Sequence, residues 1–177
     1  LETTKFNIKP GSVAIVAEDS KVARSMLEKG LQAMEIPAQL HITGKDAWEK
    51  ISVLAAQAQA EGVPITDKIA LVLTDLEMPE MDGLTMLEKL RKEGFTGKAV
   101  VLTAYSDFSY AKRAIELGIE NYLLKPIKLE ELKKTLETAS ASLRQEADTR
   151  KIQEKLLSLE QIFRSALLAE LTVDEEL

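Results

Sequence analysis

Carboxylate, hydroxyl and ammonium side chains stand at the ends of short apolar runs in this sequence. Glu18 and Asp19 follow one run, and Asp75 follows another. Thr103 and Lys125 come directly after two further runs. If these runs are parallel strands, their carboxyl ends meet at one edge of a sheet, where open α/β sheets bind their ligands. We therefore expect the five residues to form one site.

Three carboxylates at one site repel each other, and at least one of them is expected to have a raised pKa. A hard divalent cation relieves this repulsion. Mg²⁺ suits such a site because it takes one or two protein carboxylates together with waters and a phosphate oxygen. An Asp held there can attack phosphorus and form an acyl phosphate. Lys125 would supply an ammonium and Thr103 a hydroxyl for the phosphoryl oxygens, so these residue types predict phosphoryl transfer.

Five apolar runs alternate with stretches of helical periodicity, and this alternation predicts the fold. The runs at residues 13–17 and 69–73 lack polar alternation, as strands buried on both faces do. The predicted strands span residues 13–17, 38–42, 69–73, 99–102 and 121–124. Right-handed crossovers then give a parallel sheet with helices on both faces. We expect an α/β, flavodoxin-like sheet of five strands in the order 2-1-3-4-5.

The connecting helices are predicted from apolar spacing and capping residues. The first helix follows the acidic pair, and Val22 and Leu27 belong to its apolar face. We expect Asp46 to cap the second helix. Further helices are expected over residues 84–92 and 107–117.

Four motifs resemble those of response-regulator receiver domains. They are Ala17-Glu-Asp-Ser20, Leu73-Thr-Asp-Leu-Glu-Met-Pro-Glu-Met-Asp-Gly83, Val101-Leu-Thr-Ala104 and Tyr122-Leu-Leu-Lys-Pro-Ile127. Any one of them would be weak evidence, whereas the four together, in the order and spacing of the family, are highly specific. The resemblance covers roughly residues 12–138. It implies a CheY-like fold and a signalling switch controlled by phosphorylation.

The resemblance also assigns roles to the acidic residues. Asp75 matches the residue that the family phosphorylates. Glu18 and Asp19 match the acidic pair that binds Mg²⁺ together with the phosphorylated Asp. The backbone carbonyl of Glu77 is implied as a further metal ligand. Glu18 replaces an Asp that is often found first in the pair, and the replacement keeps the carboxylate.

Other matched residues contact the phosphoryl group or respond to it. Thr103 and Lys125 match the two contact residues, and Tyr122 matches a switch aromatic that turns inward when Thr103 moves toward the phosphate. Glu77 and Tyr105 occupy positions where the family tunes the lifetime of the phosphate. The implied reaction is transfer from a phosphohistidine of a sensor histidine kinase, followed by slow self-catalysed hydrolysis. On this interpretation the chain is a phosphoacceptor domain and not an ordinary enzyme.

Two other functions fit part of the pattern. A module that has kept the fold without being phosphorylated would serve dimerisation or docking, and the presence of all reactive residues argues against it. A phosphohydrolase of the haloacid-dehalogenase type also uses an aspartyl nucleophile. That class needs a second Asp two positions later, where this chain has Glu77. Glu18 and Asp19 would also be favourable at a helix N-terminus without any metal.

The chain is expected to comprise an N-terminal tail over 1–11, the receiver over 12–138 and a helical segment over 139–177. Apolar spacing fades after residue 143 and then resumes in a different phase, at Ile152, Leu156, Leu159, Phe163 and Ala166. This stripe favours a coiled-coil or helical-hairpin element that forms a homodimer. The alternative is a solvated helix leading to a missing output domain. The alternative surface for a homodimer is the face formed by the fourth helix, fifth strand and fifth helix.

Composition limits the partners of the chain. The 177 residues have a formal net charge of -6 and a sequence pI of about 5.0, which argues against binding of nucleic acid. The absence of cysteine excludes disulfides and thiolate metal sites and is compatible with a cytoplasmic location. No uncharged apolar run approaches about 18 residues, so we expect no membrane span.

The sequence has a mosaic character as well. Residues 62–75 resemble receivers attached to chemotaxis coupling proteins. Residues 105–115 and the long helix are more similar to receivers of AraC-type transcription regulators. A natural mosaic and an engineered chain both fit this pattern. Because the first residue is not Met, we expect a fragment of a longer protein or an engineered chain.

Overall fold

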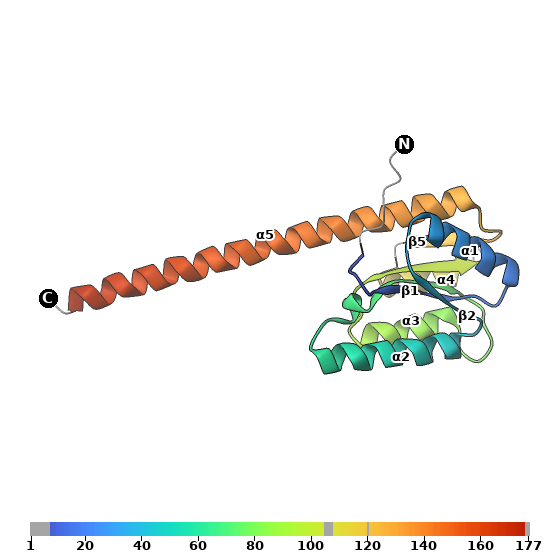
Figure 1. The fold of residues 1–177 in the computed structure, drawn as a ribbon, viewed down its shortest axis with the longest axis horizontal. Coiled ribbons are helices and arrows are strands. Elements are labelled where there is room, and N and C mark those ends of the chain that lie inside the picture. The colour runs from blue at the N-terminus through green and yellow to red at the C-terminus, as the bar shows by residue number, and fades with distance from the viewer. Residues whose placement is uncertain (1–7, 105–107, 120, 176–177) are drawn as a thin grey trace. The chain divides into compact units, whose positions relative to one another are not determined.

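The computed structural model describes residues 8–104, 108–119 and 121–175 (Figure 1). The chain divides into two compact units, Leu1–Ser140 and Ala141–Leu177. Tyr105, the first residue of the helix expected over 107–117 and most of the expected N-terminal tail lie outside the described residues.

A five-stranded parallel sheet forms the centre of the first unit. Its strands are β1 (Val13–Ala17), β2 (Ala38–His41), β3 (Ile69–Asp75), β4 (Lys98–Thr103) and β5 (Asn121–Leu124). The strand order is β2-β1-β3-β4-β5, and each neighbouring pair is parallel, so the predicted topology is confirmed. The three central strands are almost entirely buried, which explains why their sequences are continuous apolar runs.

Helices cover both faces of this sheet. They are α1 (Lys21–Ala33), α2 (Gly44–Glu61), α3 (Gly83–Lys92), α4 (Phe108–Glu116) and the first turns of α5 (Leu129–Glu175), with a short 3-10 helix η1 (Ile65–Asp67) before β3. α2, α3 and α4 share one core with the sheet, to which they contribute Ile51, Leu87 and Ala114. On the other face, Gly30 of α1 lies directly against Leu132 of α5 (Figure 1).

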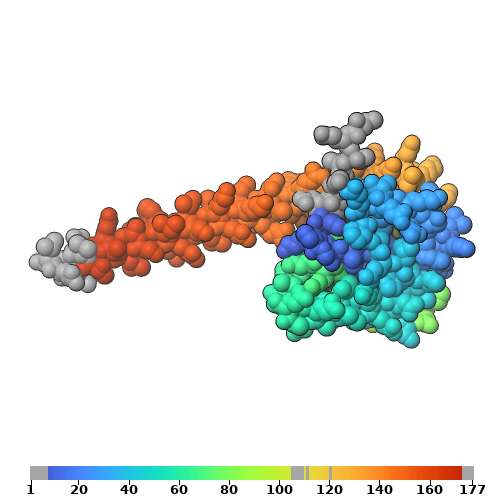
Figure 2. All heavy atoms as spheres, in the orientation of Figure 1, coloured from blue at the N-terminus to red at the C-terminus, as the bar shows by residue number. Residues whose placement is uncertain are grey.

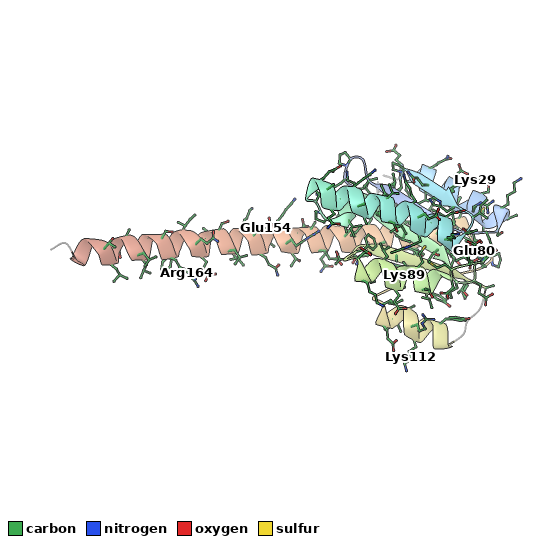
Figure 3. The ribbon with its side chains drawn as sticks, turned by 90° about the horizontal axis from the view of Figure 1, so that it is seen from below. Lys29, Glu80, Lys89, Lys112, Glu154 and Arg164 are labelled. Carbon is green, nitrogen blue, oxygen red and sulfur yellow. The ribbon has the colours of Figure 1, made fainter. Side chains whose placement is uncertain are left out.

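The only tryptophan of the chain belongs to the core between α2 and α3. Trp48 is half-buried and packs against the core cluster. The Nζ atom of Lys89, labelled in Figure 3, lies 5.7 Å from the centre of its ring, within the range of a cation–π contact. This contact ties the exposed side of α3 to the first turns of α2.

The second helix begins three residues before the predicted position. Thr43 is its N-cap, because the Thr43 backbone is extended and its Oγ1 accepts a hydrogen bond from the Asp46 backbone N–H at 3.0 Å. The expected cap at Asp46 is therefore wrong. Asp46 instead lies in the first turn, where its negative charge still interacts favourably with the helix dipole.

Two further expectations differ from the structure. Val22 is 76% exposed, because the buried face of α1 is formed by Ala23, Leu27 and their neighbours one turn further on. The strands β3 and β4 also extend by one or two polar residues beyond their apolar runs. Asp75 and Thr103 are thus the last residues of their strands, and their backbones are held in the sheet ladder.

The long helix α5 runs without interruption from Leu129 to Glu175. Its first turns belong to the first unit, where Leu132, Leu136 and Ala139 are buried. A continuous helix contains no turn, so the helical-hairpin alternative is wrong for these residues. No helix in the described part of the chain is long and apolar enough to span a membrane.

The capping interaction of α2 makes a first prediction. Thr43→Ala removes the side-chain acceptor of the Asp46 N–H and should lower the free energy of unfolding by about 1 kcal/mol. Asp46→Ala should cost about half as much, because it removes only a charge near the helix dipole. Urea-induced unfolding of both variants measures the difference. A larger loss for Asp46→Ala would show that Asp46 is the main cap after all.

Candidate functional site

Acidic residues at the carboxyl ends of β1 and β3 meet at one edge of the sheet. Carboxylate oxygens of Glu18, Asp19 and Asp75 lie within 4.8 Å of one another. The Lys125 Nζ, which follows β5, donates hydrogen bonds to Glu18 Oε1 at 2.8 Å and to Asp75 Oδ2 at 3.0 Å. The fold therefore brings together four of the five residues that the sequence places at strand ends.

The fifth residue, Thr103, ends the neighbouring strand β4. Its side chain is buried, and its backbone carbonyl accepts a hydrogen bond from the Lys125 N–H at 2.8 Å. Thr103 and Lys125 are therefore held side by side at the carboxyl edge of the sheet. Thr103 directly follows Leu102, the ladder partner of Asp75.

Glu18 is the most unusual member of the cluster. Its side chain is fully buried, and Oε1 accepts hydrogen bonds from Lys125 and from the Ser20 backbone N–H, the latter at 3.0 Å. Oε2 is also buried but has no hydrogen-bond partner among the described residues. Burial raises the pKa of Glu18, although its two hydrogen bonds act in the opposite direction. A buried acceptor without a donor is a site where a cation would be stabilised.

Lys125 keeps its charge in this setting. Burial by itself would lower the pKa of Lys125, but its hydrogen bonds and ion pairs with Glu18 and Asp75 outweigh burial and raise it. If all three carboxyl groups are ionised, one ammonium leaves two negative charges at the site. A divalent cation with oxygen ligands would balance these charges and satisfy Glu18 Oε2, so the residues present fit a metal such as Mg²⁺.

Arg24 is a supporting residue that the sequence reasoning missed. Its guanidinium extends back from α1, and one nitrogen, Nη1, donates to the backbone carbonyls of Glu18 at 2.9 Å and of Asp19 at 2.7 Å. These bonds hold the backbone of the acidic pair, from which both carboxylates extend. The contact joins a side chain to backbone carbonyls, which residue types and their spacing do not reveal, so the sequence alone gave no specific signal for it.

Two glycines fix the loop that follows Asp75. The Gly83 N–H donates to the Leu76 carbonyl at 3.0 Å, and any side chain on Gly83 would collide with the Asp75 backbone. A side chain on Gly44, at the start of α2, would likewise collide with the Met81 carbonyl. The loop is thus packed between the end of β3 and the start of α2, which explains why both positions require glycine.

The remaining predicted residues lie in this region, but their roles stay predictions. Glu77 follows Asp75 by two residues in the same loop, with an exposed side chain. Tyr122 lies in β5, is half-buried and packs against the core cluster. It pairs in the ladder with Val101, two residues before Thr103.

Comparison with known proteins identifies the family. Residues 14–137 match the model of the response regulator receiver domain. The chain belongs to this receiver family. It is 31% identical over 104 residues to the uncharacterized transcriptional regulatory protein YesN of Bacillus subtilis, a match that covers 56% of this chain and 28% of YesN. The whole receiver therefore corresponds to a minor part of that relative.

Solved receiver structures have the same fold. The receiver domain of AraT, a response regulator from Geobacillus stearothermophilus, is 28% identical with a TM-score of 0.59, over 77% of this chain and 98% of that one. The receiver domain of the histidine kinase CKI1 from Arabidopsis thaliana is 20% identical with a TM-score of 0.64, over 74% and 91% of the two chains. It was solved in complex with Mg²⁺ and BeF3⁻.

Membership of the family establishes the general function. Receiver domains are phosphoacceptor domains that take phosphoryl groups from histidine kinases, and this chain therefore acts in phosphorylation-dependent signalling. The acidic cluster at the carboxyl edge of its sheet offers carboxylate oxygens of the kind that Mg²⁺ binds.

The ion pairs of Lys125 predict a pH-dependent change in stability. Lys125→Met leaves Glu18 buried beside Asp75 without a counterion and removes interactions that lower the pKa of Glu18. A Glu with a raised pKa in the folded state contributes full stability below its ordinary pKa of 4.5, and this contribution is lost as the pH rises through the folded-state pKa. We expect a loss of about 2–3 kcal/mol at pH 8 and a smaller loss at pH 5.

Urea-induced unfolding without divalent metal measures this effect. Lys128→Met serves as the matched control, because the Lys128 side chain is 72% exposed and its nearest acid, Glu131, lies 3.9 Å away. The control should change stability little at either pH. An equal loss for Lys125→Met at both pH values would contradict the expected titration of Glu18.

Arg24 could affect Mg²⁺ binding through its charge or by positioning the backbone of the acidic pair. The direction in which Mg²⁺ affinity changes when Arg24 is replaced distinguishes these two roles. Arg24→Met removes a positive charge near the acids, which by charge alone would strengthen binding of Mg²⁺. If Arg24 positions the Glu18 and Asp19 backbones, its loss should weaken Mg²⁺ binding roughly tenfold.

Isothermal titration calorimetry with Mg²⁺ provides the measurement, with Lys21→Met as the control. Lys21 is an exposed residue of the same helix, so its loss should leave Mg²⁺ affinity unchanged or slightly higher. Arg24→Lys, which keeps a donor, should recover part of the affinity. Stronger Mg²⁺ binding by Arg24→Met would show that Arg24 acts only through its charge.

Proposed function

We propose that Asp75 accepts a phosphoryl group from a phosphohistidine of a sensor histidine kinase and that the receiver relays this event as a conformational change. The observation that carries the proposal is the cluster in which Asp75 lies beside Glu18 and Asp19 and pairs with Lys125 at 3.0 Å. The kinase would be the phosphodonor in a cytoplasmic two-component pathway, because receivers take phosphoryl groups from such kinases.

The transfer requires a nucleophilic carboxylate and a cation near the transferred group. A carboxylate oxygen of Asp75 would attack phosphorus as the phosphorus–nitrogen bond of the donor breaks, and the released imidazole would take up one proton. Lys125, already within hydrogen-bond distance of Asp75, would pair with a phosphoryl oxygen, and the Thr103 hydroxyl with another. Slow hydrolysis by water would later return Asp75 to a carboxylate and release inorganic phosphate.

Glu18, Asp19 and Asp75 would hold Mg²⁺, with the backbone carbonyl of Glu77 as a further ligand. When bound, Mg²⁺ supplies positive charge for the phosphoryl oxygens in transfer. The unpartnered Glu18 Oε2 and the net charge of the cluster support this assignment. The Mg²⁺ and BeF3⁻ in the CKI1 receiver support it as well.

Thr103 and Tyr122 would form the conformational switch. Phosphorylation would bias an equilibrium between two arrangements by drawing Thr103 toward the phosphate and letting Tyr122 turn inward. Tyr122 is half-buried at the margin of the core, and it pairs in the ladder two residues before the end of β4. This placement supports coupling between the two side chains.

The division of the chain is part of the proposal. Residues 12–138 would be the receiver, and residues 139–177 a helical linker through which two copies form a homodimer. The apolar side chains of the linker support dimerisation, because they are exposed in a single chain.

Intact-mass spectrometry after incubation with acetyl phosphate and Mg²⁺ tests the proposed acceptor. The chain should gain one phosphoryl group of about 80 Da, and Asp75→Asn should gain none. Asp82→Asn is the matched control. Asp82 caps α3 through the Thr85 N–H, and Asn keeps that cap, so the control should be phosphorylated normally.

Two results would contradict the proposed acceptor. Phosphorylation of Asp75→Asn would move the acceptor to another residue. A folded chain that binds Mg²⁺ but gains no phosphoryl group and does not bind BeF3⁻ would be a docking module without phosphorylation. Binding of BeF3⁻ without a phosphorylated product would instead indicate a short-lived phosphoryl group on Asp75.

A further inference from the structure

The second unit exposes an unusual amount of apolar surface. Its large apolar side chains are 47–68% exposed, and every side chain described over residues 151–172 is exposed. Figure 2 shows this segment, coloured orange to red, as a narrow rod of atoms. An isolated helix gains little stability in water without packing of its apolar face, so these side chains require a partner.

The spacing of the apolar residues defines one contact seam. Ile152, Leu156, Leu159, Phe163 and Ala166 follow each other at intervals of four, three, four and three residues. This is the alternation of d and a positions in a coiled coil. We call these five residues the seam. A continuous helix carries all of them, so they lie on one face.

The opposite face of residues 152–166 is polar apart from Leu157, which occupies a b position and is 59% exposed. Glu154 and Gln161 occupy the f positions and Ser158 and Ser165 the c positions, all of them exposed. Glu154 is labelled in Figure 3. A helix with one apolar seam and a polar back is suited to a single partner helix and not to the interior of a large bundle.

Charges beside the seam favour a second copy in parallel orientation. Lys155 occupies a g position and Glu160 the e position five residues later. In a parallel, in-register pair, the g residue of one helix faces this e residue of the other, so Lys155 of each copy meets Glu160 of its partner. An antiparallel pair would place e opposite e and g opposite g, and this opposite-charge contact would be lost.

Glu160 also forms an ion pair within its own helix, with Arg164 at 2.7 Å. Arg164, labelled in Figure 3, occupies the following b position. At the C-terminal end, Ala166 is small for a d position. Ile162 at g and Leu167 at e flank this place and would cover the space that Ala166 leaves.

We propose that residues 152–166 form a parallel, in-register, two-stranded coiled coil with the same segment of a second copy. This inference gives a contact and an orientation to the homodimer proposed above. It does not require phosphorylation of Asp75, so the two proposals can fail independently. In both copies the receiver precedes the coil in the sequence, so a parallel pair would attach the two receivers to the same end of the coil.

Disulfide crosslinking of the full chain tests the orientation, because the chain has no cysteine of its own. Ile152→Cys and Ala166→Cys place a thiol at opposite ends of the seam, where a parallel pair brings each residue next to its own copy. Both variants should form covalent dimers within minutes of mild oxidation. Gln161→Cys is the control at an outward-facing position and should crosslink far more slowly.

Two outcomes would overturn the proposal. An antiparallel dimer would separate each cysteine from its copy by several helical turns, so light scattering would show a dimer while neither variant crosslinks. A monomeric mass for the unmodified chain at concentrations of tens of micromolar would exclude the homodimer itself. Circular dichroism checks that each cysteine variant is folded. Repeating the crosslinking with Asp75→Asn added to each variant checks that phosphorylation of Asp75 does not account for the result.

Charge reversal provides an independent measurement on the full chain. Lys155→Glu would place two like-charged pairs in each dimer and should raise the dissociation constant roughly tenfold. Adding Glu160→Lys restores opposite charges between the copies and should return the dissociation constant toward its original value. Failure of the double variant to recover any affinity would contradict the proposed contact between Lys155 and Glu160.

Discussion

The ammonium of Lys125 is the interaction on which the site depends. It joins a fully buried Glu18, directly after β1, to Asp75 at the end of the neighbouring strand β3, although Lys125 itself follows β5 at the edge of the sheet. Buried carboxylates without a counterion would be costly. The cluster therefore requires three things together. They are this strand order, parallel strands and a side chain as long as that of lysine.

A second set of constraints acts on the backbone around the cluster. Arg24 holds the carbonyls of the acidic pair, and Gly44 and Gly83 let the loop after Asp75 pack against the end of β3 and the start of α2. None of these three residues supplies a reactive group. They define the positions from which the reactive side chains extend, and the precision of a metal or phosphoryl site depends on such supporting residues.

The sequence predicted the strands, their order and the meeting of acids and Lys125, because buried parallel strands leave clear apolar runs and bring their carboxyl ends to one edge. It did not predict the roles of Arg24 and Gly44, because these contacts depend on the direction of backbone carbonyls and not on residue type. The cap of α2 was misplaced for a similar reason, since both Thr43 and Asp46 are good capping residues and only the backbone conformation selects between them.

The half-buried Trp48 gives the molecule a useful spectroscopic property. It is the only tryptophan, it lies in the core between α2 and α3, and the second unit contains none. Indole emission therefore reports on the receiver alone, while the far-ultraviolet signal also contains the long helix. Melting of the sheet and separation of paired helices can thus be observed as two distinct optical events in one unlabelled sample.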